Sequence, residues 1–392
     1  MSAGGTSGKH DGMSVMLRSL CASCALLAAL AAAAATAADR TLPTVPAGFT
    51  LEAVAHVTGA RELAVAPNGD LFIGTLGSDV MLLRAPESRN VGQPETFAHI
   101  DEAPDAGVAV AGSDVYVGTR YGVWRVPFDA SDKAGTPVKL ASVRTGGGGG
   151  HSTTSVALLD GRLYAGVGSS CNACVETDPT RATIQELAPS GGALRAKAVH
   201  IRNAIALAVA PDGALWAGVA GQDELERGHP YEIFDAVTKH AGVVDYGWPV
   251  CYENHRRAGN ADADCAHQTV PSAVFPAYDT PIGATFYPAK PTGRYAFPAA
   301  YAGGAFVTLH GSWHQPPVPP RVAFVPMRNG MPATPVDWAD PAAQWREFVG
   351  GFQRADGSRI GRPTGIAVGR EGSLFVADDQ TGTIYRIRPA RG

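Results

Sequence analysis

The chain has 392 residues, a formal net charge of −4 and 17% charged residues, so its composition predicts no basic face for nucleic acid or anionic lipid. It holds 47 glycines and 29 prolines but only 8% aromatic residues, a composition typical of many short strands joined by tight turns. This length suits one large all-β domain or two ordinary domains.

The first segment in chain order is typical of an export signal. Basic residues precede an apolar run over 20–35, and a small-x-small cleavage site follows directly. We therefore predict a signal peptide over 1–37, starting at Met1 or Met13, and a single mature domain over 38–392 that is periplasmic or secreted. An uncleaved anchor is the alternative, although the run is shorter than the ~20 residues that span a bilayer. The mature chain has no predicted membrane span.

One phrase recurs along the mature chain: an aliphatic strand, a turn that usually contains glycine, and a second strand ending in small residues. The copies lie at 63–75, 107–119, 155–167, 206–219, 364–378 and, more weakly, 283–309. Each copy predicts a β-hairpin, and repeats of this size that each build a small antiparallel sheet indicate a β-propeller. We predict an all-β propeller of six four-stranded antiparallel blades, with segment 48–55 joining the last blade to close the ring.

Four cysteines remain after the predicted signal peptide: Cys171, Cys174, Cys251 and Cys265. An even number in an oxidising compartment favours two disulfides. Of the three possible pairings we favour Cys171 with Cys174 and Cys251 with Cys265. A four-cysteine zinc site is the alternative, although the second pair lacks the short spacing of such sites. Val175 stands where a covalently attached c-type haem needs a histidine, which excludes that cofactor.

Candidate chemistry lies just before the third and fourth copies of the repeat. Five glycines over 146–150 lead into His151, which is either a general base or a structural histidine in a glycine-rich turn. Arg202 and Asn203 directly precede a strand, where they are suited to hold an anion or a carbonyl, unless they are surface charge beside a turn. The acidic stretch 221–232 is either a cation site or a solvated loop.

Two intervals between copies, 222–274 and 310–361, are longer than the others, and we expect their excess in loops that carry function. Trp248 and Trp313 are candidate walls of a binding site, and Arg362 suggests an anionic ligand, although a capping contact would also explain it. No serine-hydrolase elbow, phosphate-binding loop, zinc-protease helix or dinucleotide fingerprint is present, which argues against those classes.

Together these phrases resemble the quinoprotein sugar dehydrogenases, the soluble glucose/sorbosone dehydrogenase group of six-bladed propellers that use pyrroloquinoline quinone (PQQ). The resemblance covers the whole mature chain, and its most specific motifs are GSSCNACVE at 168–176 and HGSW at 310–313. It implies oxidation of an aldose, a sorbosone-like sugar or a related polyol by hydride transfer to PQQ. The electrons would leave to a separate cytochrome or membrane quinone.

The resemblance also implies residue roles. His151 would remove the hydroxyl proton, and a calcium ion held by the backbone carbonyls of Gly221 and Gln222 would bind the cofactor's edge. The remaining cofactor-binding set would be Arg202, Asn203, Trp248, Trp313, Arg321 and Arg362.

The chain departs from the family pattern at several positions, including 204–206 and 220–223. Relatives commonly carry an arginine shortly after the base, where Thr154 stands, and an Asn-Arg pair after HGSW, where His314 and Gln315 stand. PQQ carries three carboxylates, and each lost charge-assisted contact costs on the order of 1.5–3 kcal/mol; Arg321 would substitute for one of them. The alternative function is therefore a non-redox propeller that binds a sugar, a lactone or a protein partner.

Overall fold

The computed structural model describes residues 42–146, 149–223, 225–259, 262–314 and 316–390. The predicted signal peptide and Gln315 lie outside these residues. The chain divides into two units, Met1–Leu42 and Pro43–Gly392, and every described strand belongs to the second. Within the described residues, no helix has the length and apolar character needed to cross a membrane.

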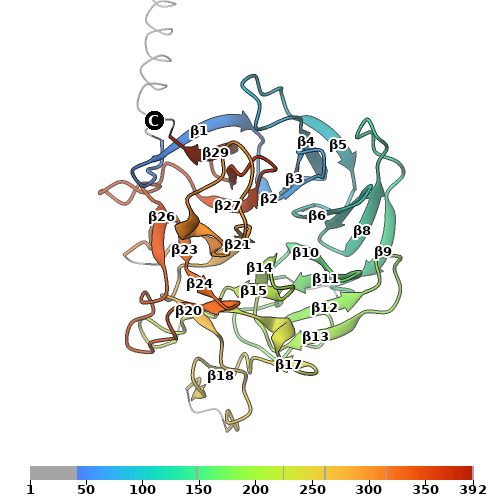
Figure 1. Ribbon diagram of the computed structural model, residues 1–392. Helices are drawn as coiled ribbons and strands as arrows, with labels where there is room; N and C mark the ends of the chain where they lie inside the picture. The colour runs from blue at the N-terminus through green and yellow to red at the C-terminus, as the bar shows by residue number, and fades with distance from the viewer. Residues whose placement is uncertain (1–41, 147–148, 224, 260–261, 315, 391–392) are drawn as a thin grey trace, which may run out of the picture. The chain divides into compact units, whose positions relative to one another are not determined.

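The second unit is built from six sheets, here called blades, that follow one another along the chain (Figure 1). Blade 1 contains β2 (Ala60–Val65), β3 (Leu71–Thr75), β4 (Asp79–Leu83) and β5 (Glu95–His99). Blade 2 contains β6 (Gly107–Ala111), β7 (Asp114–Gly118), β8 (Gly122–Pro127) and β9 (Val138–Ser142). Blade 3 contains β10 (Thr154–Leu159), β11 (Arg162–Val167), β12 (Thr183–Leu187), β13 (Arg195–Val199) and a short parallel strand, β17 (Val244–Asp245).

The other three blades carry the longest connections. Blade 4 contains β14 (Ala204–Val209), β15 (Leu215–Val219), β16 (Glu232–Asp235) and β20 (Ala273–Phe275). Blade 5 contains β21 (Pro281–Phe286), β22 (Ala305–Leu309), β23 (Arg321–Val325) and β26 (Arg346–Val349). Blade 6 contains β27 (Pro363–Val368), β28 (Leu374–Asp378), β29 (Thr383–Pro389) and β1 (Phe49–His56). Minor elements are β18 (Cys251–Tyr252), β19 (Arg256–Arg257), β24 (Met327–Arg328), β25 (Met331–Pro332), η1 (Val237–Lys239) and η2 (Ala299–Tyr301).

The innermost strand of each blade contacts that of the next, in the order β2, β6, β10, β14, β21 and β27, and β27 contacts β2 again (Figure 1). Strand β1 pairs antiparallel with β29, with Phe49 opposite Pro389. The six-bladed propeller and its closure by the N-terminal strand are therefore confirmed. Each predicted hairpin is the inner pair of strands of one blade.

Glycines in the second strand of a blade explain why the repeat ends in small residues. A Cβ on Gly74, Gly118 or Gly166 would overlap a backbone carbonyl at the start of the next blade's inner strand. Near the axis, the backbones of neighbouring blades therefore pack directly on each other, because glycine has no side chain to keep them apart. Further out, apolar clusters fill the space between blades, such as the one in which Trp216 and Phe286 lie 5.8 Å apart between ring centroids.

The two long intervals are not loops alone. Interval 222–274 contains β16, β17 and the β18–β19 hairpin, and interval 310–361 contains β23 and β26. The outer strands of blades 4 and 5 were missed because they are short and no glycine turn joins them in a hairpin, so they carry little of the period-2 signal on which strand prediction depends.

Candidate active site

The propeller topology brings the candidate residues to one end of the ring. All six inner strands run in the same direction relative to the axis, because each blade repeats the same meander. The segments just before the inner strands and the turns between second and third strands therefore gather at one end, here called the mouth. His151, Arg202 and Arg362 precede β10, β14 and β27, and the 168–182 turn joins β11 to β12.

His151 lies at the mouth with one ring nitrogen committed and the other open. Its Nδ1 is 3.1 Å from both the carbonyl oxygen and the Oγ of Ser169, and Ser169 Oγ donates its own proton to the carbonyl of Cys171. Because a carbonyl only accepts, Nδ1 must carry the ring proton. Nε2 has no hydrogen-bond partner among the described residues, so the tautomer that these contacts assign presents a lone pair there.

The electrostatic surroundings of His151 favour its neutral form. Burial, together with the nearby guanidiniums of Arg202, Arg144 and Arg181, lowers the pKa of His151 to about 4, while the Ser169 carbonyl opposes this shift. The imidazole is therefore neutral at pH 7 and able to accept a proton.

Asn203 lies beside His151 because Gly168 leaves room for both. A Cβ on Gly168 would overlap the Asn203 amide oxygen and crowd Cβ of His151. Asn203 Oδ1 is buried without a hydrogen-bond partner among the described residues. A buried amide with an unsatisfied atom indicates a place for a polar ligand group.

Arg202 uses all five donors of its guanidinium on the protein itself. Nε donates to the carbonyl of Asn172 at 3.1 Å, and Nη2 donates to Asn172 Oδ1 at 2.9 Å and to Asp223 Oδ2 at 3.1 Å. Nη1 donates to the carbonyls of Ala220, at 3.4 Å, and Gly221. Arg202 therefore joins the disulfide loop, the segment between Cys171 and Cys174 that contains Asn172, to the turn after β15.

These contacts bear directly on the predicted calcium site. The Gly221 carbonyl, one of the two predicted ligands, accepts a hydrogen bond from Arg202, and the carboxylate of Asp223 is paired with the same guanidinium. A second carboxylate at this turn, Glu232, accepts a hydrogen bond from Gly221 N at 2.6 Å. A calcium ion needs six to eight oxygen ligands and would be repelled by a guanidinium on its own ligand. In this arrangement the Gly221 carbonyl and the Asp223 carboxylate bind the Arg202 guanidinium and not a calcium ion. Calcium at Gly221 and Gln222 stays a prediction.

On the other side of the mouth, blades 5, 6 and 1 share a second polar cluster. His310 Nε2 lies 3.0 Å from Asp379 Oδ1, and Arg61 Nη1 lies 2.8 Å from Asp379 Oδ2. Arg362 donates to the carbonyls of His310, at 3.3 Å, and Gly311, at 3.4 Å. Burial lowers the pKa of Arg362 to about 10, opposed by Asp379.

Three aromatic rings form a stack at the rim of the mouth. The rings of Tyr278 and His314 lie 3.7 Å apart, and those of His314 and Trp313 lie 4.3 Å apart, nearly parallel in both pairs. Trp313 is 71% exposed, and His314 Nε2 lies 3.5 Å from Asp223, the partner of Arg202. Position 314, where relatives usually carry asparagine, therefore joins the rim to the Arg202 cluster.

The structure places two predicted cofactor ligands away from the open part of the mouth. Arg321 lies 3.5 Å from Asp279 and 4.0 Å from Glu347, so it is directed toward the outer strand of blade 5. Trp248 is 7% exposed and donates from Nε1 to the Asn172 carbonyl at 3.2 Å, behind the disulfide loop. Trp248 thus supports the loop that holds Arg202.

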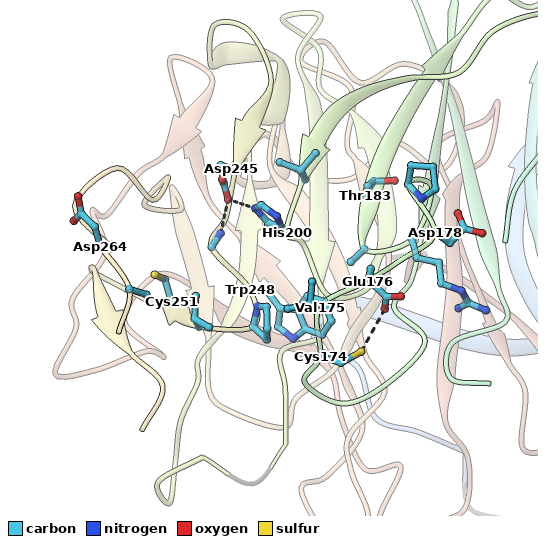
Figure 2. A pocket seen from close by; sticks show the side chains of 18 residues that line it. Cys174, Val175, Glu176, Asp178, Thr183, His200, Asp245, Trp248, Cys251 and Asp264 are labelled. Atoms are coloured by element: carbon cyan, nitrogen blue, oxygen red, sulfur yellow. Dashed lines mark hydrogen bonds and ion pairs between the residues drawn. The ribbon is translucent and has the colours of Figure 1, made fainter. Parts of the chain in front are cut away.

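Both predicted disulfides are present, Cys171–Cys174 and Cys251–Cys265. They staple two loops that flank a cavity of about 480 Å³, with Trp248 between them (Figure 2). His200 and Asp245 pair at 2.9 Å on the wall of this cavity. Cys174 and Cys251 both line this cavity, whereas Arg202 does not, so the cysteines shape one of its walls.

The charge balance at the mouth fits an anionic ligand. The side chains of Arg144, Arg359 and Arg362 donate to carbonyl or hydroxyl oxygens, and none of the three forms an ion pair with a carboxylate within the described residues. Burying guanidinium groups without carboxylates is unfavourable unless another anion compensates. A tricarboxylate such as PQQ suits this excess of positive charge.

A family model described as TrAA12-like matches residues 246–390. That part carries HGSW, Trp248 and the segment around Arg362. The predicted resemblance to the quinoprotein sugar dehydrogenases is confirmed. His151 and Arg202 lie outside the matched residues, so the proposed base depends on the geometry of this chain.

Solved propellers share the fold of this chain over most of its length. The PQQ domain of pyranose dehydrogenase from Coprinopsis cinerea, in its holo form, aligns with a TM-score of 0.77 at 18% identity, over 89% of this chain and 97% of that one. The PQQ-bound aldose sugar dehydrogenase of Streptomyces coelicolor aligns with a TM-score of 0.61 at 16% identity, over 88% of this chain and 99% of that one. At such identities the likeness shows the fold alone.

Two further comparisons frame these results. A calcium structure of a Trichoderma reesei enzyme of carbohydrate-active family AA12 aligns with a TM-score of 0.73 at 19% identity, over 89% of this chain and 97% of that one. An uncharacterized protein of Borreliella burgdorferi is 26% identical over 195 residues, which is 48% of each chain. The aligned part thus spans about half the length of that curated relative.

Sequence reasoning missed several mouth residues. Arg144 and Tyr278 belong to no motif used in the prediction, and they reach the site only through contacts between blades. Asp223 lies in the acidic stretch 221–232 and Asp379 directly follows the last copy of the repeat, but neither was predicted as a site residue. For Arg144 one signal was available, because it stands two residues before the glycine run that leads to His151.

Proposed function

We propose that this protein is an exported PQQ-dependent dehydrogenase that oxidises a hydroxyl group of an aldose, a sorbosone-like sugar or a related polyol. The observation that carries the proposal is His151, whose protonated Nδ1 is held by Ser169 while Nε2 is open beside buried arginines. The PQQ-bound and calcium-bound propellers of the same fold support it, as do the two disulfides, which suit an oxidising compartment.

The chain's own residues would handle the proton. When bound, PQQ would supply the hydride acceptor. His151 Nε2 accepts the proton of the substrate hydroxyl, while the Ser169 contacts fix the ring orientation and the tautomer. Three guanidiniums near the ring make the protonated form unfavourable. Carboxylates held beside those guanidiniums offset their charge and raise the pKa of His151, so the base becomes stronger in the loaded site.

Cofactor carboxylates would be held by groups that have capacity left. Arg362 has this capacity, because it makes only long contacts to carbonyls. The unsatisfied atom of Asn203 is its amide oxygen Oδ1, which would instead accept a hydrogen bond from an N–H or hydroxyl group of the ligand. Trp313 offers an exposed ring at the rim, where an apolar sugar face would pack. The electron acceptor, a cytochrome or a membrane quinone, is proposed as a separate partner.

A second candidate follows from the saturation of Arg202. If that guanidinium keeps all its protein contacts, the Arg-Asn pair has no cationic donor for a quinone, and the mouth binds a sugar, a lactone or a protein partner without redox chemistry. The open Nε2 of His151 weighs against this reading, because a binding site alone does not need an unpartnered base.

The test uses the purified exported chain. PQQ is titrated while tryptophan fluorescence is followed, once with calcium and once with a chelator, and dye reduction is then measured over a panel of aldoses and polyols. We expect PQQ binding and sugar-dependent dye reduction. Failure of both sinks the dehydrogenase proposal, and sugar binding without dye reduction supports the second candidate.

A further inference from the structure

Arg144 is an unusual residue for the edge of a propeller blade. It follows β9, its side chain is almost completely buried at 2% exposure, and it forms no ion pair with a carboxylate within the described residues. Burial, with Arg181 and Arg120 nearby, lowers its pKa to about 9. Its φ of +56° lies in the left-handed region, which disfavours a residue with a Cβ. The buried guanidinium and the left-handed backbone both lower the stability of the folded state, so we expect another part of the structure to depend on Arg144.

The guanidinium of Arg144 is spent on the segment that carries His151. Nε donates to the carbonyl of His151 at 3.1 Å, and Nη2 donates to the carbonyl of Thr153 at 2.6 Å. Nη1 donates to Thr154 Oγ1 at 2.5 Å and to the carbonyl of Arg120 at 2.9 Å. Three of the four acceptors therefore belong to four consecutive residues.

The same segment is wedged from the other side by blade 2. The carbonyl of Thr154 packs so closely on Gly107 and Gly118 that a Cβ on either glycine would overlap it. Thr154 itself is 0% exposed. The segment is thus held between the guanidinium of Arg144 and the backbone of the neighbouring blade.

The glycine run gives this clamp a purpose. Five glycines directly before His151 have more backbone freedom than any other residues, so the run by itself does not fix the direction of the imidazole. Next to Arg144, the run is fastened where Gly146 N donates to Asp178 Oδ2 at 2.8 Å, and Arg144 N donates to Thr180 Oγ1 at 2.9 Å. Arg144 is therefore held in place before the glycine run, and its guanidinium holds the residues that follow the run.

We propose that Arg144 is the positioning residue of His151: its guanidinium fork, bonded to the His151 and Thr153 carbonyls and to the Thr154 hydroxyl, holds Nε2 toward the open mouth. The inference rests on the proposed function, in which His151 is the base. It also gives Thr154 a role. Where the family pattern predicts an arginine shortly after the base, this chain supplies the guanidinium from position 144 and a hydroxyl to receive it.

The test separates positioning from general stability with a matched pair at one position. Thr154→Val removes the hydroxyl that receives Nη1, whereas Thr154→Ser keeps it. Arg144→Lys keeps the charge but not the planar fork. Thr308→Val serves as the control, because Thr308 is also a fully buried hydroxyl, bonded to the carbonyls of Gly283 and Thr364, and contacts neither Arg144 nor His151.

The first readout does not need the cofactor. Deuterium exchange at the C2 position of each histidine ring, followed by mass spectrometry from pH 3 to 8, reports the pH midpoint of His151. The charged groups facing this ring are Arg144, Arg181 and Arg202, all cationic, with Ser169 as the hydrogen-bond partner. We expect the midpoint to rise toward the ordinary histidine value in Thr154→Val and Arg144→Lys, because the ring becomes better solvated, and to stay unchanged in Thr154→Ser and Thr308→Val.

The second readout is turnover in the PQQ-loaded protein. We expect kcat to fall about tenfold in Thr154→Val and about 10- to 100-fold in Arg144→Lys with KM little changed, and Thr154→Ser to restore it. An unchanged midpoint in Thr154→Val overturns the positioning role, even if Arg144→Lys fails to fold. A shifted midpoint in a protein that oxidises no sugar leaves the positioning role standing and refutes the proposed function alone.

Discussion

Two histidines at the mouth differ in what surrounds them rather than in their acidity. Burial lowers the pKa of both His151 and His310 to about 4. His310 has Nε2 bonded to Asp379, which also pairs with Arg61. His151 faces guanidiniums, and its Nε2 has no partner among the described residues. A depressed pKa therefore does not identify the base; what separates the two rings is the carboxylate bonded to His310, where His151 has only the oxygens of Ser169.

The difference also separates a charge-balanced region from an unbalanced one. Around His310, Asp379 pairs with Arg61 and partly offsets the charge of Arg362, so that side of the mouth has a carboxylate beside its histidine. Around His151, Arg144 and Arg202 lie near the ring and only Arg202 has a carboxylate in contact. We infer that the His151 side gains more from an anionic ligand.

The largest expected effect is at the two histidines themselves. His151→Ala is expected to lower kcat by about 10²- to 10⁴-fold while PQQ still binds, because a general base contributes that much. His310→Asn is expected to lower mainly the melting temperature, because it weakens the contact with Asp379. Steady-state kinetics, PQQ titration and thermal unfolding of both variants give the comparison. Greater loss of turnover in a well-folded His310→Asn protein would reverse the assignment.

Arg362 and Arg321 provide the next comparison. Arg362→Gln is expected to raise the Kd for PQQ about 10- to 100-fold, because it removes a charged donor that has no carboxylate contact of its own. Arg321→Gln is expected to leave Kd unchanged and to lower stability, because Arg321 is directed at Asp279 and Glu347. Fluorescence titration with PQQ decides between them. Equal effects on Kd would show that Arg321 turns toward the ligand.

Gly168 tests the packing that places Asn203 beside His151. Gly168→Ala is expected to cost about 1–3 kcal/mol of unfolding free energy and to lower kcat, because the added Cβ has no room between the two side chains. Gly149→Ala is the control, since a Cβ there meets nothing within 4 Å. Denaturant unfolding and kinetics of both variants measure the difference. An unaffected Gly168→Ala enzyme would mean that the pair is not close-packed in solution.

The sequence was most informative where the chain repeats itself. Inner hairpins were predictable because period-2 strands and terminal glycines recur, and those glycines are required wherever one blade's backbone packs on the next. Outer strands β16 and β23 lack that signal. His151 was found through its glycine run, but the clamp by Arg144 was not, because it joins residues on either side of the run through hydrogen bonds to backbone carbonyls. The side-chain direction of Arg321 was equally unpredictable, since it depends on Asp279, before β21, and on Glu347 in β26.

The last prediction concerns stability alone, at Glu62, which lines a narrow cavity on the propeller axis together with residues of all six inner strands. Burial raises the pKa of Glu62 to about 8, against the lowering effects of Ser155 and Arg61. Because its unfolded pKa is near 4.5, the folded state holds the extra proton, so stability falls by about 1.4 kcal/mol per pH unit as pH rises from 4.5 to 8.

His151 and His310 act in the opposite direction. Their folded pKa values lie below the unfolded value of 6.5, so their contribution is fully present above pH 6.5 and is lost as pH falls toward 4. Glu62→Gln removes only the carboxyl effect. The difference in melting temperature between Glu62→Gln and the unmodified protein is therefore expected to be near zero at pH 4.5 and to grow up to pH 8. Below pH 6.5 the variant still loses stability as pH falls, because both histidines are unchanged. A difference that does not depend on pH would show that Glu62 is ionised and solvated in the folded protein.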